Sequence, residues 1–217
     1  MSLPVAELPG RLESSLARHI GARRADIESL CAEARERSFR AVCVTSSCVE
    51  LARALLEDSA VQVVALVGFP HGAIDSDAKR FETEVVVDQG AHEVDFVLNL
   101  GMLKDGDHKA VLREMRDIVE AADERPVSAV LESHLLTHDE KIRGCELALD
   151  SGVKQVCASL QFNPVEPMLG EVALLHKSLG GELAVKTFAD IRTVRQAMVL
   201  LDAGAARIGM MAGVTLA

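Results

Sequence analysis

The amino-acid sequence predicts a single-domain α/β protein, a (β/α)8 barrel over residues 1–217. Seven short, apolar, β-branched stretches alternate with longer amphipathic segments, which is typical of parallel strands covered by helices. Three joins share the order Asp, any residue, Gly and then a strand, as in DQG at residues 88–90. A chain of 217 residues also suits one such barrel. An open doubly wound sheet is the alternative, although no Gly-rich dinucleotide fingerprint follows a strand.

The expected strands are short and rich in valine and alanine. In chain order they cover residues 39–45, 61–69, 92–99, 127–133, 153–159, 182–188 and 206–210. A weaker eighth candidate, RLESSL at residues 11–16, would complete the barrel.

The expected helices carry apolar residues three and four positions apart, as a helix packed on a sheet requires. They cover residues 25–38, 48–58, 77–90, 109–124, 139–152, 167–180 and 191–204. Glycine at the end of three of them supplies a left-handed cap, because it has no Cβ to clash. The repetition indicates repeated strand–helix units.

Composition excludes several functions. Hydrophobic residues make up 49% and aromatic residues 3%, so the core must be aliphatic. A net charge of −10 with scattered Lys and Arg argues against nucleic-acid binding. No apolar run reaches the ~20 residues of a membrane span. Five cysteines without a C-x-x-C pair favour a reducing cytoplasm. We expect no cofactor and no metal.

Polar residues gather where the expected strands end, which is the functional end of such a barrel. Asp95 and Asn99 share a strand face, and Glu132 ends the next strand. Cys157 and Lys186 belong to the two strands after that. A charge inside an apolar strand is costly unless it is paired. Asp95 and Lys186 therefore form either a structural ion pair or an acid–base pair whose pKa values depend on each other.

At these residues the sequence resembles the deoxyribose-phosphate aldolase family, which consists of class I aldolases on a (β/α)8 barrel. The resemblance runs from about LESSL to RIGMMAG. It rests on FRAVCVT, LVGFPHGA, GAHEVDFVLNLGMLKDG, AVLESHLL, VKTFADIRT and GAARIG. Shared motifs in this order are stronger evidence for fold than for activity.

The resemblance implies a reaction that this chain cannot run unaltered. In the family, a lysine on the sixth strand forms a Schiff base, a lysine on the seventh lowers its pKa, and an aspartate on the fourth relays protons. Lys186 and Asp95 match the second and third of these residues. Cys157 occupies the Schiff-base position, and a thiol cannot form an imine.

The family's phosphate site is altered as well. Gln161 replaces a loop glycine, and Ala189 and Asp190 replace a Gly-Gly pair through which backbone N–H groups approach an anion. Met210 or Met211 replaces a serine. Asp190 would repel a phosphate. With these positions, the resemblance implies a substrate site formed by Cys43, Thr45, Asn99, Ser159, Gln161, Ala189, Asp190, Gly209 and Met210.

Two replacement nucleophiles are conceivable. Lys186 could take over the Schiff base, but acidic neighbours would hold its amine protonated. Cys157 could act as a thiolate, with Lys186 lowering its pKa and His134 as base, although a free cysteine is usually a small buried hydrophobe. A metal site of Cys43, Cys157 and His134 lacks ligand spacing.

Three functional hypotheses therefore stay open. The first is a deoxyribose-phosphate aldolase-family lyase with absent or weak activity on 2-deoxyribose-5-phosphate. The second is a non-catalytic barrel that binds a small ligand or regulates a partner. The third is an enzyme of changed chemistry that uses Lys186, Asp95 and Glu132 on a non-phosphorylated substrate. The expected ligand is a small carbonyl or sugar-like molecule, and because small barrels often pair, a homodimer is the expected assembly.

Overall fold

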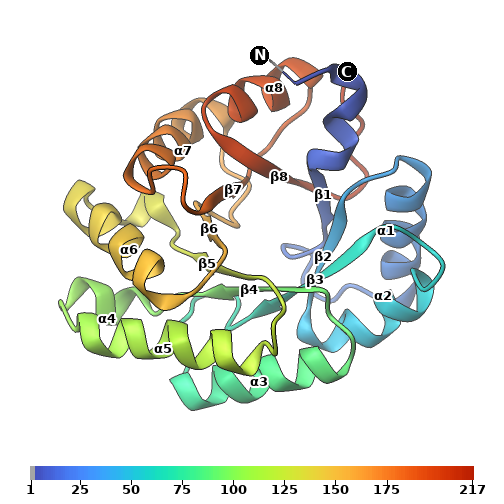
Figure 1. Cartoon of the computed structure of the whole chain (residues 1–217). Helices are drawn as coiled ribbons and strands as arrows, with labels where there is room; N and C mark the ends of the chain where they lie inside the picture. The colour runs from blue at the N-terminus through green and yellow to red at the C-terminus, as the bar shows by residue number, and fades with distance from the viewer. Residues whose placement is uncertain (1–2) are drawn as a thin grey trace.

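The computed structural model describes residues 3–217, and the first two residues of the predicted domain lie outside them. Eight parallel strands close into a barrel in chain order, with β8 paired to β1 (Figure 1). The predicted (β/α)8 barrel is confirmed, including its weak first strand, and the open doubly wound alternative is wrong. The strands are β1 (Leu12–Ser15), β2 (Ala41–Thr45), β3 (Gln62–Val67), β4 (Glu93–Val97), β5 (Val127–Val130), β6 (Gln155–Cys157), β7 (Ala184–Phe188) and β8 (Ala205–Met211).

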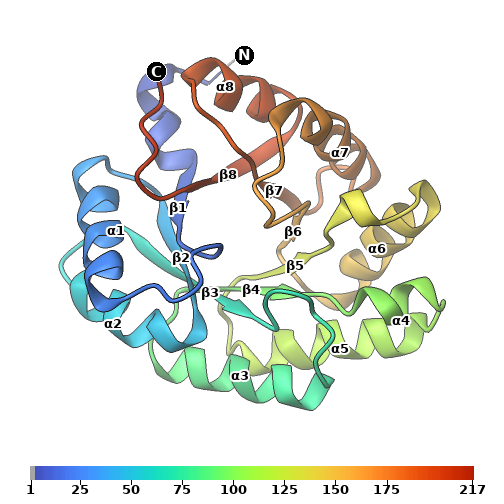
Figure 2. The same ribbon diagram turned by 180° about the vertical axis from the view of Figure 1, so that it is seen from behind.

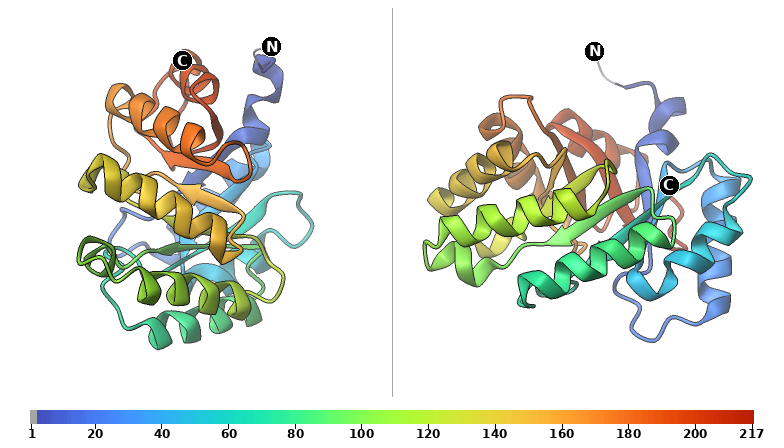
Figure 3. Two further views of the ribbon diagram at one scale, coloured as in Figure 1. Left: turned by 60° about the vertical axis from the view of Figure 1, so that its left-hand side comes forward. Right: turned by 60° about the horizontal axis from the view of Figure 1, so that its bottom comes forward.

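Helices surround the barrel and cover the outer face of its strands (Figures 1 and 2). The view from the side shows neighbouring helices lying next to one another around the sheet (Figure 3). The α-helices are α1 (Arg24–Glu36), α2 (Val49–Leu55), α3 (Ser76–Asp88), α4 (Leu100–Lys104), α5 (His108–Ala121), α6 (His138–Ser151), α7 (Val165–Ser178) and α8 (Val194–Asp202). The 3-10 helices are η1 (Val5–Arg11), η2 (Ser46–Cys48) and η3 (Ser133–Leu135).

Local side-chain caps decide where the helices begin. Thr137 and Thr193 each form a capping box with the residue three positions later, so α6 and α8 begin directly after them. This is why α8 starts three residues later than the predicted boundary at 191. The glycine ends behave as predicted, because Gly90, Gly152 and Gly204 have φ values of +90°, +95° and +113°.

The aliphatic residues form two cores. The larger core lies between the helices and the outer face of the strands, and it includes Val63, Val94, Ala129 and Ile208. A smaller cluster fills the barrel itself and includes Leu66, Val97, Val130 and Phe188. Residues of one strand alternate between the two cores, as the pleat of a strand requires. Within residues 3–217, no helix is both long and apolar enough to cross a membrane.

Candidate functional site in the barrel interior

Three charged side chains meet inside the barrel. Nζ of Lys186 lies 2.7 Å from Oε2 of Glu13 and 2.6 Å from Oδ2 of Asp95, and all three side chains are fully buried. They belong to β7, β1 and β4, which are not neighbours in the sheet, so their contacts cross the interior. The geometry agrees with the ion-pair alternative for Asp95 and Lys186. Glu13, by contrast, was missed, because its strand is short and buried along its whole length.

The two carboxylates keep the lysine charged. Burial alone would lower the pKa of Lys186, but Asp95 and Glu13 outweigh burial and raise that pKa above its ordinary value. Burial also raises the pKa of Asp95 to about 6, and Lys186 offsets only part of that rise. A protonated amine is not a nucleophile, so the ground state of Lys186 is unsuited to imine formation.

The ion pairs continue toward the other end of the barrel. Arg207 lies 3.1 Å from Glu13 and 3.0 Å from Glu93, and its Nε donates to Gln155. Arg40 in turn lies 3.3 Å from Glu93. We call this network of linked ion pairs, together with Lys186 and Asp95, the interior ion chain. It contains three cations (Arg40, Lys186 and Arg207) and three carboxylates (Glu13, Glu93 and Asp95). Such a balance is what burial of charge demands.

Two cysteines border Lys186. Cys157 lies opposite Lys186 in the sheet, and Cys43 lies opposite Ser15 of β1. Both thiols are fully buried. Burial, reinforced by Asp95, raises the pKa of each thiol well above its ordinary value, against the smaller opposing effect of Lys186. Burial therefore works against activation of Cys157 by Lys186. Nδ1 of His134 lies 3.6 Å from Oε2 of Glu132.

These buried thiols should make the protein sensitive to alkali. An unfolded thiol ionises near pH 9.0, whereas Cys43 and Cys157 stay protonated in the folded protein. Above that pH the folded state binds more protons, so stability falls by about 1.4 kcal/mol per pH unit for each thiol. We expect Cys157→Ala to flatten this slope in urea denaturation between about pH 8 and 10 under reducing conditions. Cys48→Ala, at a partly exposed thiol, is the matched control. Equal slopes in wild type and Cys157→Ala would contradict the assignment.

Glu132 organises the loop after β6. Its backbone has a φ of +42°, and its carboxylate accepts hydrogen bonds from Oγ of Ser159 at 2.7 Å and from the N–H of Leu160 at 2.9 Å. These bonds turn the chain, so β6 ends at Cys157 rather than at the predicted residue 159. The backbone carbonyl oxygen of Gln161 accepts a hydrogen bond from the guanidinium of Arg18 at 2.9 Å. Glu132 thus holds a loop, and its carboxylate is already occupied.

An apolar plug from the β6 loop and the end of β7 lies over Lys186. The plug consists of Leu160, Phe162 and Phe188, which are at most 5% exposed. The two phenylalanine rings stack edge to face with centroids 5.4 Å apart, and Nζ of Lys186 lies 5.4 Å from the centroid of Phe188. At Gly209 an added Cβ would lie 2.1 Å from the Phe188 ring, so the ring needs that glycine. The interior ion chain is therefore sealed from the mouth.

The expected phosphate loop has no backbone donors to spare at its centre. The N–H groups of Phe188, Ala189 and Asp190 donate to the carbonyls of Ser159, Gly209 and Asn163 at 2.9, 3.1 and 3.0 Å. The Asp190 carboxylate pairs with Arg192 at 2.7 Å. Without free N–H groups at its centre, this loop lacks the donors with which a backbone binds an anion.

Two other predicted residues lie away from the interior. Asn99 accepts from the N–H of Met102 and caps α4, because β4 already ends at Val97 and the expected alternation stops there. Met210 is 1% exposed and packs in the outer core, since its neighbour Gly209 takes the inward position. Asn99 thus lies past the end of β4 as a helix cap, and Met210 lies in the outer core.

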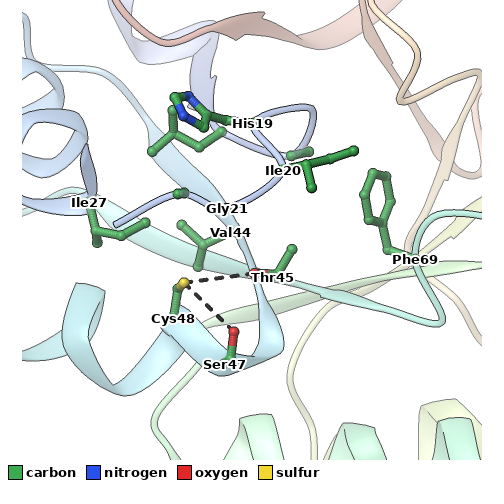
Figure 4. Close-up of a pocket in the computed structure, with 12 residues that line it drawn as sticks. His19, Ile20, Gly21, Ile27, Val44, Thr45, Ser47, Cys48 and Phe69 are labelled. Carbon is green, nitrogen blue, oxygen red and sulfur yellow. Dashed lines mark hydrogen bonds between the residues drawn. The ribbon is translucent and has the colours of Figure 1, made fainter. Parts of the chain in front are cut away.

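Thr45 lines a cavity of about 310 Å³ at the mouth, between the loop after β1 and η2 (Figure 4). His19, Ser47 and Cys48 supply its other polar groups, while Ile20 and Phe69 are apolar walls. The Cys48 thiol lies 3.7 Å from Oγ1 of Thr45 and 3.8 Å from Oγ of Ser47. Neither Lys186 nor Cys157 lines this cavity. Across residues 3–217, no three His, Cys, Asp or Glu side chains are placed to hold a metal ion.

Comparisons with known proteins identify the family. The model of the DeoC/LacD family aldolases matches residues 10–151. The deoxyribose-phosphate aldolase of Streptococcus equi subsp. zooepidemicus is 38% identical over 193 residues, which are 89% of this chain and 88% of that protein. That of Bdellovibrio bacteriovorus is 38% identical over 195 residues, covering 90% and 89% of the two chains.

Solved structures agree. A putative deoxyribose-phosphate aldolase from Coccidioides immitis superposes with a TM-score of 0.91 at 30% identity, over 96% of this chain and 83% of that one. The deoxyribose phosphate aldolase of Aeropyrum pernix, described as a tetramer, gives 0.86 at 26% identity over 95% and 87%. A shared barrel, a family model over most of the chain and this identity to aldolases lead to one conclusion: the chain belongs to the DeoC/LacD aldolase family.

Proposed function

We propose that this member of the family does not carry out Schiff-base aldol cleavage and is a barrel that binds a small ligand at its mouth. The observation that carries the proposal is the state of Lys186. Its amine is held between Glu13 and Asp95 and is covered by Phe188. The family mechanism needs a neutral amine that a carbonyl carbon can reach, and Cys157 cannot replace it.

The expected ligand site is the mouth cavity beside Thr45. Its volume of about 310 Å³ suits a small carbonyl or sugar-like molecule, with hydroxyl groups directed to Thr45, Ser47 and His19. Calorimetric titration of 2-deoxyribose into wild type and into Thr45→Val tests this assignment. Unchanged affinity in the variant would refute it. The hypothesis of changed chemistry gains no support, because Glu132 is engaged by Ser159 and Leu160.

We expect borohydride trapping to find no Schiff base at Lys186. The protein is incubated with acetaldehyde, and separately with 2-deoxyribose-5-phosphate, reduced and mapped by peptide mass spectrometry. Adducts on the exposed Lys109 measure background alkylation. A deoxyribose-phosphate aldolase from a relative serves as positive control for the reaction.

An adduct on the Lys186 peptide above the Lys109 background would overturn the proposal and restore the class I mechanism at β7. A cleavage rate on 2-deoxyribose-5-phosphate like that of ordinary enzymes would do the same.

A homodimer is the assembly we propose, whereas the relative from Aeropyrum pernix is described as tetrameric. Sedimentation equilibrium of the purified chain decides between these states.

A further inference from the structure

A second cavity lies at the opposite pole of the barrel. Its volume is about 540 Å³, and its walls include Arg40, Glu93, Lys154 and Gln155. Glu93 and Gln155 are the first residues of β4 and β6, and Arg40 directly precedes β2. The cavity therefore opens where the strands begin, whereas the mouth lies where they end. We call it the basal cavity.

The basal cavity is lined by more positive than negative charge. Four cationic side chains line it, from Arg11, Arg40, Lys154 and Arg207, against the single carboxylate of Glu93. The chain as a whole carries a net charge of −10, so this surplus is local. Asp202 lies nearby, in a neighbouring hollow that Arg11 also lines. With Asp202 counted, and also Glu13, which pairs with Arg207 behind the wall of the cavity, one cation remains in excess.

The hydrogen bonds show which cations are available. Glu93 is already satisfied, since it pairs with Arg207 and Arg40 and accepts from Gln155. Arg11 makes one long contact, 3.4 Å, to the carbonyl of Ala206. Among residues 3–217, no side-chain partner is found for Lys154, which is exposed. Arg11 and Lys154 therefore add donors that the protein's own acceptors do not use.

The other two guanidinium groups are held in place. Arg207 is 8% exposed and is fixed by Glu93, Glu13 and Gln155. Arg40 keeps 43% of its side chain exposed while Glu93 holds one of its nitrogens. A guanidinium presents paired N–H donors that match the oxygens of a carboxylate or a phosphate. Fixed donors lose little entropy on binding, which favours affinity.

We propose that the basal cavity binds a small multivalent oxyanion, a molecule carrying two or more phosphate or carboxylate groups. The volume lies within the range of small-molecule sites. The donors are of the kind that recognises such groups. Arg11 and Lys154 provide the mobile half of the site. Arg40, which uses one nitrogen on Glu93, provides the fixed donors, while Arg207 adds its charge.

The test is calorimetric titration of the whole chain with pyrophosphate and with citrate at low ionic strength. Sodium chloride at equal ionic strength separates a bound anion from general screening. The variant Arg11→Gln/Lys154→Gln removes the two available cations. The control Arg113→Gln/Lys109→Gln removes two exposed cations from α5 and changes the net charge equally.

We expect wild type and the α5 control to bind alike, and the basal variant to bind at least about tenfold more weakly. A difference between the two probes tells phosphate chemistry from carboxylate chemistry. The proposal would be overturned if neither pyrophosphate nor citrate bound to wild type, or if all three proteins bound them equally. The four positions changed are exposed, so thermal melting of each variant should match wild type and exclude misfolding.

Discussion

Replacing Lys186 by methionine should lower the free energy of unfolding by about 3–5 kcal/mol at neutral pH. Methionine matches the stem of lysine but leaves Glu13 and Asp95 buried without their shared cation. Glu13 keeps its contact with Arg207, but Asp95 is left without a cation, and an unpaired buried carboxylate is costly, so Asp95 would take up a proton. The loss should therefore shrink as the pH falls toward 5, where protonation neutralises Asp95. Urea denaturation at several pH values measures both effects.

A double variant separates charge from packing. Lys186→Met/Asp95→Asn removes one carboxylate together with the amine, and we expect it to regain part of the lost stability. Lys109→Met, at an exposed lysine of α5, should change stability by less than about 0.5 kcal/mol. A loss at Lys186 as small as that at Lys109 would mean that the interior ion chain contributes nothing to folding.

Replacing Phe188 by alanine should cost about 3–5 kcal/mol, because it empties the centre of the plug. The ring contacts Phe162 and covers both Lys186 and Gly209, and the backbone cannot close the space it leaves. Phe81 offers a matched control, since its side chain is 66% exposed on α3 and loses little on truncation. Denaturant unfolding of Phe188→Ala and Phe81→Ala compares the two.

The same variant also tests whether the plug shields the interior. Opening the barrel admits water beside Asp95, Lys186 and Cys157, so the Cys157 thiol should react faster with a small thiol reagent under native conditions. Wild-type protein should show reaction at the partly exposed Cys48 first. Unchanged reactivity of Cys157 in Phe188→Ala, together with a small stability loss, would show that another element seals the site.

Local patterns allowed much of the architecture to be predicted. Strand alternation and the cost of an unpaired charge placed Asp95 and Lys186 together inside the barrel. The Asp-x-Gly joins predicted the glycine caps. Glu13 was not predicted because its strand was the weakest of the eight candidates, and Arg207 was not predicted because it lies near the start of β8, away from the strand ends where polar residues were sought. The plug was not predicted because it depends on a tertiary contact, in which Glu132 of one loop turns the loop after β6.

The geometry differs from two expectations about the site. Asn99 was assigned to the interior face by continuing the alternation of β4, but a strand's parity ends where the strand ends. Cys157 was considered for activation by Lys186, but burial acts on the thiol more strongly than one cation that two carboxylates already neutralise. The order of residues along a strand shows which residues are neighbours. It does not show whether burial or a nearby charge has the larger effect on the pKa of a thiol.

The equal count of charges in the interior ion chain limits what position 157 can hold. A lysine introduced there would be a fourth cation against three carboxylates, placed opposite Lys186 in the sheet. It would also meet the buried side chains of Phe188 and Leu160. Such a lysine would thus be disfavoured both electrostatically and sterically, so the interior of this barrel is closed to a further cation. Accommodating one would need coordinated changes, namely a compensating carboxylate and smaller side chains at the plug.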